Sequence, residues 1–86
     1  MQLVTGSSTP SSNSTQLLTV VCPAGKVAIG GGAQVVGGNT SVALSDSRPA
    51  MVVNGRPNGW FASAFEVAAY ASAWQITIHV VCADVT

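Results

Sequence analysis

Lys26 follows Gly25 and precedes a run of glycines, an arrangement that looks like a phosphate-binding loop. Such a loop needs Gly-x-x-x-x-Gly-Lys followed by Ser or Thr, because its backbone N–H groups hold the phosphates and its hydroxyl reaches the metal ion. Here Val20 occupies the position of the first glycine, and Val27 occupies that of the hydroxyl residue. The dinucleotide-binding pattern also fails, at Val35. We therefore expect no nucleotide site.

His79 is the one histidine, and with a serine and Asp46 or Asp84 it could in principle form a nucleophilic triad. No Gly-x-Ser-x-Gly turn supports that arrangement. The carboxylates of Asp46, Glu66 and Asp84 are too few and too scattered to suggest an acid/base pair for glycoside hydrolysis. We expect no catalytic residue and no enzymatic activity.

Asn54, Arg56, Asn58 and Trp60 bring an aromatic ring close to several hydrogen-bonding groups. Sugar-binding sites combine such groups, so these four residues are a candidate glycan-binding or interface site. The other interpretation is that they are turn residues followed by a tryptophan of the core.

Cys22 and Cys82 end two apolar segments with matching contexts, TVVC and HVVC. If these segments are neighbouring strands, a disulfide could form and would close a loop of about 60 residues, contributing about 4 kcal/mol. Two buried free thiols are the alternative. Two cysteines do not make a zinc site, and His79 lies on the opposite face of its strand from Cys82. We expect neither a metal nor a cofactor.

The elements that position these residues are all predicted to be strands, separated by Gly, Pro and Asn turns. Turns are expected at residues 22–25, 37–40, 54–55 and 58–59, and Arg48-Pro49 is expected to end a strand. The expected strands are residues 15–22, 26–36, 41–47, a short strand at the start of 50–59, 60–67 and 73–85. This pattern predicts an all-β fold, a small antiparallel β-sandwich or barrel.

The last strand has the clearest alternation, with one apolar face and one polar face. The apolar face comprises Trp74, Ile76, Ile78, Val80 and Cys82. Residues 60–67 differ, because both of their faces are apolar: Trp60, Ala62 and Ala64 share one face, and Phe61, Phe65 and Val67 share the other. Either one face meets another subunit, or the strand is central between two layers.

The glycine run Gly30-Gly31-Gly32 lies inside a predicted strand, where glycine indicates a bulge or a very close contact. One interpretation is that a large side chain, such as Trp60 or Trp74, lies flat on this backbone. The other is that strands from three subunits approach one another here at an axis.

Charged residues make up 7% of the 86 residues, against about 25% in an average globular protein, and the net charge is zero. A neutral chain lacks the basic footprint that nucleic acid or an anionic membrane requires. No apolar run approaches the roughly 20 residues that span a bilayer. Because 48% of the residues are hydrophobic, we expect the chain to form an oligomer or to belong to an assembly.

Residues 5–16 are almost all small and polar, which is typical of a flexible segment. We expect a flexible N-terminal arm over residues 1–16, able to dock on a neighbouring subunit, and a β-domain over residues 17–86. No signal peptide is visible at the N-terminus. This fits a protein made in the cytoplasm and released with a virion on lysis.

The segments CPAGKVAIGGGA (22–33), SRP (47–49), NGW (58–60) and VVCA (80–83) together are similar to a small β-domain of bacterial, especially actinobacterial, surface and secreted proteins. Similar domains follow collagen-like stretches and occur in phage virion and tail proteins. The resemblance implies that Cys22 and Cys82 are paired, and it implies no catalytic residue. This chain stands without a collagen-like partner, which favours the phage setting.

The resulting expectation is a non-enzymatic virion component, such as a capsid decoration protein or a small tail protein, whose partners are copies of itself and capsid or tail proteins. Such appendages are often trimeric, so the resemblance implies a trimer. The alternative is a lectin-like adhesion module that binds surface glycans through the Trp60 region. A third possibility is a secreted or cell-surface host protein whose leader has been removed.

Overall fold

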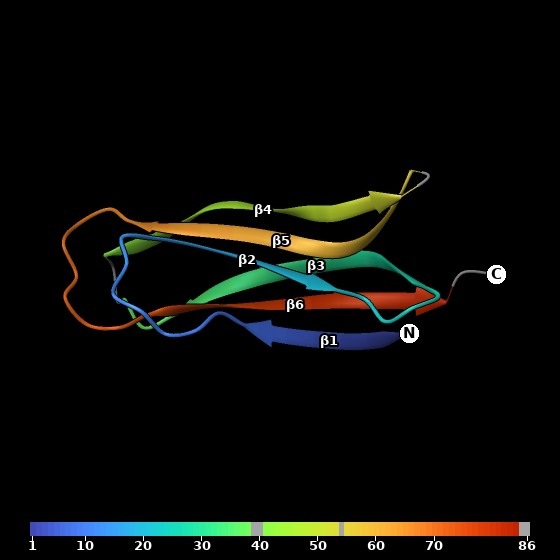
Figure 1. The fold of residues 1–86 in the computed structure, drawn as a ribbon, viewed down its shortest axis with the longest axis horizontal. Coiled ribbons are helices and arrows are strands. Elements are labelled where there is room, and N and C mark those ends of the chain that lie inside the picture. Colours follow the sequence, from blue (N-terminus) through green and yellow to red (C-terminus); the bar gives the residue numbers. More distant parts are fainter. Residues whose placement is uncertain (39–40, 54, 85–86) are drawn as a thin grey trace.

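The chain forms six strands in two three-stranded antiparallel sheets, as a computed structural model describes for residues 1–38, 41–53 and 55–84 (Figure 1). The strand order is β1-β6-β3 in one sheet and β2-β5-β4 in the other. The described residues contain no helix. The predicted all-β class is therefore confirmed, and the two separate sheets make the fold a sandwich. The strands are β1 (Gln2–Ser7), β2 (Thr15–Val21), β3 (Lys26–Val36), β4 (Val42–Val53), β5 (Arg56–Glu66) and β6 (Gln75–Asp84).

The core lies between the sheets, where β6 faces β5. The predicted alternation of the last strand is confirmed, because its apolar face is fully buried while the intervening residues are partly exposed. Ala62 and Ala64 of β5 pack against this face, and their small side chains leave room for the larger residues of β6. The buried residues contributed by the last predicted strand are Trp74, Ile76, Ile78, Val80 and Cys82.

The two apolar faces of β5 have different surroundings. Ala62 and Ala64 face the other sheet and are buried, whereas Phe61 and Phe65 lie on the outer side. β5 is the middle strand of its own sheet. The described part of the chain forms only two layers, so no third layer covers the outer side of β5. Its outer side is the side that another protein could cover.

The expected flexible arm over residues 1–16 is not what the structure shows. β1 pairs with β6 from Gln2 opposite Cys82 to Ser7 opposite Thr77. The N–H of Ser8 then donates to the carbonyl of Ile76 at 2.9 Å. Backbone hydrogen bonds to β6 hold this segment, and they do not depend on the polar side chains that suggested disorder. β2 also begins at Thr15, inside the expected arm.

The strand expected over residues 41–47 continues through Arg48-Pro49 to Val53. β4 is an edge strand, which has one side without a hydrogen-bonded neighbour. Proline is tolerated there because its missing N–H can face the open side. Pro49 therefore does not end the strand, contrary to the sequence expectation.

One of the expected turns also lies elsewhere. Asn58 and Gly59 are inside β5, opposite β2 and β4, and form no turn. Gly55 lies between β4 and β5 with φ of +75°, which suits glycine in a tight connection. Asn54, the other residue expected in that connection, lies outside the described residues. The turn before β3 is confirmed, since Gly25 has φ of +82° and Lys26 N–H donates to the Pro23 carbonyl.

Candidate functional site

The residues of the candidate glycan or interface site lie on the first half of β5. Arg56, Asn58 and Trp60 alternate along this strand, so they share one of its faces. That face is turned toward the other sheet, because Ala62 and Ala64 continue it into the core. Asn54, the fourth member of the set, is not among the described residues.

Trp60 lies between the two sheets and against the glycine run. A Cβ atom placed on Gly31 would come within 2.7 Å of Cδ2 and 2.9 Å of Cε3 of the indole ring. The indole Nε1 donates a hydrogen bond to Ser47 Oγ at 2.9 Å. The prediction that a large aromatic side chain lies on the glycine run is confirmed for Trp60. Its ring is occupied in packing and does not form an open platform for a sugar.

Asn58 is engaged through its main chain, whose carbonyl oxygen accepts a hydrogen bond from Cys22 N–H at 2.7 Å. This bond places the end of β2 beside β5 and brings Cys22 toward the interior. Arg56, nearer the start of β5, is exposed. The three described residues therefore have different environments and do not converge on a common pocket.

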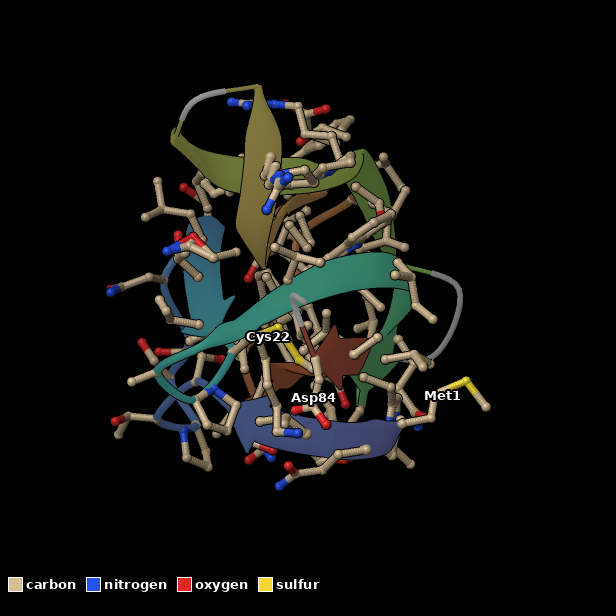
Figure 2. The ribbon with its side chains drawn as sticks, turned by 90° about the vertical axis from the view of Figure 1, so that its right-hand side faces the viewer. Met1, Cys22 and Asp84 are labelled. Atoms are coloured by element: carbon tan, nitrogen blue, oxygen red, sulfur yellow. A yellow bond between two sulfur atoms is a disulfide. The ribbon has the colours of Figure 1, made fainter. Side chains whose placement is uncertain are left out.

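Cys22 and Cys82 are joined by a disulfide, with their Cα atoms 5.9 Å apart (Figure 2). Cys22 follows β2 in one sheet and Cys82 belongs to β6 in the other, so the bond links the two sheets covalently. Both residues are buried, and they form a small core cluster with Ala28 and Val80. The position of this bond, deep in the sandwich, suits a structural role.

His79 lies on the outer side of the β1-β6-β3 sheet among neutral polar groups. Its Nδ1 is 3.2 Å from Thr5 Oγ1, and its Nε2 is 3.3 Å from Gln34 Oε1. Neither neighbour is a carboxylate that could orient the imidazole for base catalysis. Among the described residues, no three His, Cys, Asp or Glu side chains form a group that could hold a metal ion.

Lys26, the residue that suggested a phosphate loop, has a partner of its own. Its Nζ lies 2.6 Å from Asp84 Oδ1 in the neighbouring strand β6. This hydrogen bond, together with the charge of Lys26, holds the pKa of the Asp84 carboxyl below its usual value. The pair joins the start of β3 to the end of β6, which is a structural arrangement.

The most distinctive surface of the described chain is the outer side of the β2-β5-β4 sheet. It carries Leu17, Val21, Phe61 and Phe65, a set that we call the outer apolar face. Leu17 is 64% exposed, Val21 47% and Phe65 39%. Sequence reasoning identified the two phenylalanines but missed the contribution of β2. The alternation of residues 15–21, with Gln16, Leu18 and Val20 turned inward, was the signal that could have revealed it.

Charge on this side of the sheet is balanced locally. The guanidinium carbon of Arg48 lies 4.7 Å from the centre of the Phe61 ring. Arg48 Nε also lies 3.1 Å from Asp46 Oδ2. The cation therefore has an aromatic neighbour and an anionic neighbour within its own chain, so a protein that covers this side meets no unpaired charge at Arg48.

Comparison with protein-family models, with curated proteins and with solved structures finds no match to this chain. Within the residues that the structure describes, no helix is long and apolar enough to span a membrane.

Proposed function

We propose that the chain is a non-enzymatic structural protein that functions by packing against other protein subunits. The observation that carries this proposal is the outer apolar face on the β2-β5-β4 sheet. Exposed apolar side chains that gather on one face of a protein are typical of binding surfaces, and here Thr15, Thr19 and Ser63 lie between them. Full burial of a Leu, Val or Phe side chain contributes about 1.5–3 kcal/mol, so covering Leu17, Val21 and Phe65 would stabilise an assembly.

The setting that we propose is a phage virion, where the chain serves as a capsid decoration protein or a small tail component. This part of the proposal is supported by the resemblance of residues 22–33, 47–49, 58–60 and 80–83 to small β-domains found in virion and surface proteins. The disulfide between Cys22 and Cys82 also suits a protein that must persist outside the cell, since oxidising surroundings preserve such bonds.

A glycan-binding function receives no comparable support. Trp60, which would have to stack on a sugar ring, lies on the backbone of Gly31 and donates its N–H to Ser47. The structural proposal instead uses side chains that are exposed. A glycan array probed with the purified chain separates the two functions, since strong binding to a defined sugar would contradict this preference.

The proposed setting is tested on virus particles from the genome that encodes the chain. We expect mass spectrometry of purified particles to detect the chain at a fixed ratio to the major capsid or tail protein. Deletion of its coding sequence should give particles that lack it, and added purified chain should rebind to them. Absence of the chain from the particles would overturn the virion proposal.

A matched pair of variants identifies the surface that binds the particle. Phe65→Ser removes an aromatic ring from the outer apolar face, whereas Leu3→Ser removes a more exposed apolar side chain from the opposite sheet. We expect Phe65→Ser to rebind poorly and Leu3→Ser to rebind like the wild type. Equal loss in both variants would show that the outer apolar face has no special role.

A further inference from the structure

The two sheets have four edge strands, namely β1, β3, β2 and β4. An open edge presents unpaired N–H and C=O groups, and proteins usually protect it with proline, charge, a bulge or short length. β4 contains Pro49 together with Asp46 and Arg48. β3 begins with Lys26 and has an irregular register between Ala28 and Gly30. Both of these edges therefore carry recognised protection.

The other two edges differ from each other. β1 has only six residues, includes Gly6, and uses Thr5 and Ser7 in side-chain hydrogen bonds with β6. β2 has seven residues and contains no glycine, proline or charged residue. Neither β1 nor β2 contains proline or a charged residue, and β2, which is one residue longer and has no glycine, is the more regular of these two open edges.

The hydrogen bonds at the two ends of the β2-β5 ladder show which groups of β2 are free. Cys22 N–H donates to Asn58 O, and Glu66 N–H donates to Ser14 O. Because N–H and C=O groups of an antiparallel strand point alternately to its two sides, the even-numbered residues of β2 bond to β5. The odd-numbered residues direct their backbone groups to the open side. These residues are Thr15, Leu17, Thr19 and Val21.

Within the described part of the chain, no other strand pairs with this side of β2. The side chains of its odd-numbered residues are also exposed. β2 therefore offers four N–H donors and four C=O acceptors in a row, flanked by the exposed Leu17 and Val21. A strand that pairs with this edge would satisfy all eight groups.

We propose that β2 pairs with β2 of a second copy of the chain, antiparallel and about a two-fold axis that passes Leu18. In this register Thr15 lies opposite Val21 of the other copy, and Leu17 lies opposite Thr19. Every free backbone group of both edges is then bonded, and the two β2-β5-β4 sheets become one sheet of twice the width. A symmetric contact of this kind uses the same patch on both partners.

The side chains and charges of β2 favour a second copy as the occupant. In this register Leu17 meets Thr19 and Thr15 meets Val21, so residues of high β-propensity stand beside uncharged neighbours and no like charges are opposed. Neither strand carries a charge, and the net charge of the chain is zero. Two copies therefore approach without electrostatic repulsion, and pairing buries no ionic group on β2.

The dimensions of the molecule also suit a side-by-side contact. The strands run along the long axis (Figure 1), and the molecule measures 47 × 19 × 16 Å. At about 3.3 Å per residue, the seven residues of β2 span roughly 23 Å, about half of the 47 Å length. A partner strand beside β2 therefore runs parallel to the long axis, and the contact consists of the backbone and side chains of β2.

This inference deepens the proposed function by naming a partner and a contact, but it is tested separately in solution. A two-fold contact gives twice the 8.6 kDa mass of one chain, whereas the trimer expected from the sequence gives three times that mass. Sedimentation equilibrium of the purified, oxidised chain distinguishes these stoichiometries. We expect a reversible dimer.

Two variants test the contact itself. Leu17→Lys places two like charges near the two-fold axis, and we expect it to weaken dimerisation at least about tenfold. Leu3→Lys is the matched control, because Leu3 is 61% exposed and Leu17 is 64% exposed, on edges of opposite sheets. Thr19→Pro removes an N–H that faces the open edge, so it should abolish the dimer without breaking the ladder to β5. Circular dichroism confirms that each variant folds.

Hydrogen exchange gives an independent readout on the wild type. The amides of Leu17 and Thr19 should become protected as concentration rises, whereas that of Leu3, on the free edge of β1, should not change. A wild type that stays monomeric, or a dimer that both variants leave intact, would overturn the β2 contact. Presence of the chain in virus particles would be unaffected by that result, so the inference and the proposed function can fail independently.

Discussion

The indole ring of Trp60 rests directly on the backbone of Gly31, although the two residues belong to different sheets. A Cβ atom on Gly31 would lie 2.7 Å from the ring and 3.0 Å from the carbonyl oxygen of His79. The ring and the strand therefore occupy space that any side chain at position 31 would need. This contact lets the two sheets approach closely beside the disulfide-containing part of the core.

Gly31→Ala should destabilise the fold by about 1–3 kcal/mol, the usual cost of inserting a methyl group where neighbouring atoms leave no room for it. The added methyl group must displace either the indole or the strand β6. Its effect is measured as a shift of the midpoint in urea or guanidinium denaturation, followed by tryptophan fluorescence.

Gly30→Ala and Gly32→Ala are the matched controls, because a Cβ atom at either position meets nothing within 4 Å. Alanine there reduces the freedom of the unfolded chain, so it should leave stability unchanged or raise it by about 0.4–1 kcal/mol. If all three variants lost stability equally, glycine would be needed here for its backbone alone and not for the contact with Trp60.

Replacing both Cys22 and Cys82 with Ala should lower the free energy of unfolding by about 4 kcal/mol in the chain-entropy model. The bond closes a separation of 60 residues and ties β2 to β6 across the sandwich. Because small domains have total stabilities of about 5–15 kcal/mol, this is a large fraction. Thermal unfolding should show a much lower midpoint for the double variant.

A reducing agent provides the control for this experiment. It should lower the midpoint of the wild type toward that of the double variant and leave the double variant unchanged. A wild type that is insensitive to complete reduction, verified by mass spectrometry of alkylated thiols, would show that the fold does not depend on the bond.

Gln16→Leu should destabilise the chain by about 1–3 kcal/mol, because it removes hydrogen bonds inside the protein. Gln16 is buried, and its Nε2 donates to the carbonyls of Trp74 at 2.8 Å and Ser11 at 3.0 Å. Its Oε1 accepts from Ser8 Oγ at 3.0 Å. These bonds hold the connection between β1 and β2, so amide exchange at Ser11 should also accelerate.

The matched control is Gln34→Leu. Gln34 is exposed, and the one hydrogen bond that its side chain forms among the described residues joins its Oε1 to Nε2 of His79 at 3.3 Å. Its effect on the denaturation midpoint should be within about 0.5 kcal/mol, as for most surface substitutions. Equal effects of the two replacements would contradict the role given to Gln16.

Sequence reasoning predicted the parts of the fold in which the polarity of each side chain indicates whether it is buried. β6 alternates between apolar and polar residues because one face meets the core and the other does not. Gly25 and Gly31 were recognisable because a tight turn and a close contact each require a residue without Cβ. Such features follow from local steric requirements, and the residue types at these positions indicate them.

The features that sequence reasoning missed depend on which strands become neighbours in the fold. β1 is held by backbone bonds to β6, and polar residues such as Thr5 and Ser7 give no sign of that pairing. A proline would end a central strand, but Pro49 is tolerated because β4 is an edge strand. The sequence of residues 42–53 does not indicate whether β4 lies at the edge or in the middle of its sheet. For the same reason, Trp60 was a candidate for ligand contact until its neighbour across the sandwich was known.

Lys26 and Asp84 form an ion pair whose contribution to stability depends on pH. The hydrogen bond from Lys26 and its positive charge lower the pKa of Asp84 in the folded chain. A lowered folded pKa means that the pair stabilises the fold above the pKa of the unfolded carboxyl and that this contribution is lost as the pH falls through the folded value. The change is therefore expected below about pH 4, the ordinary range of an Asp carboxyl.

Lys26→Met removes the partner while keeping an apolar stem of similar length. We expect the Asp84 carboxyl, followed by its carbon chemical shift in a pH titration, to titrate at higher pH in this variant than in the wild type. The difference in stability between the two proteins should shrink as the solution is acidified, and salt should weaken it because both groups reach solvent. Identical titration curves for Asp84 in the two proteins would show that the ion pair does not persist in solution.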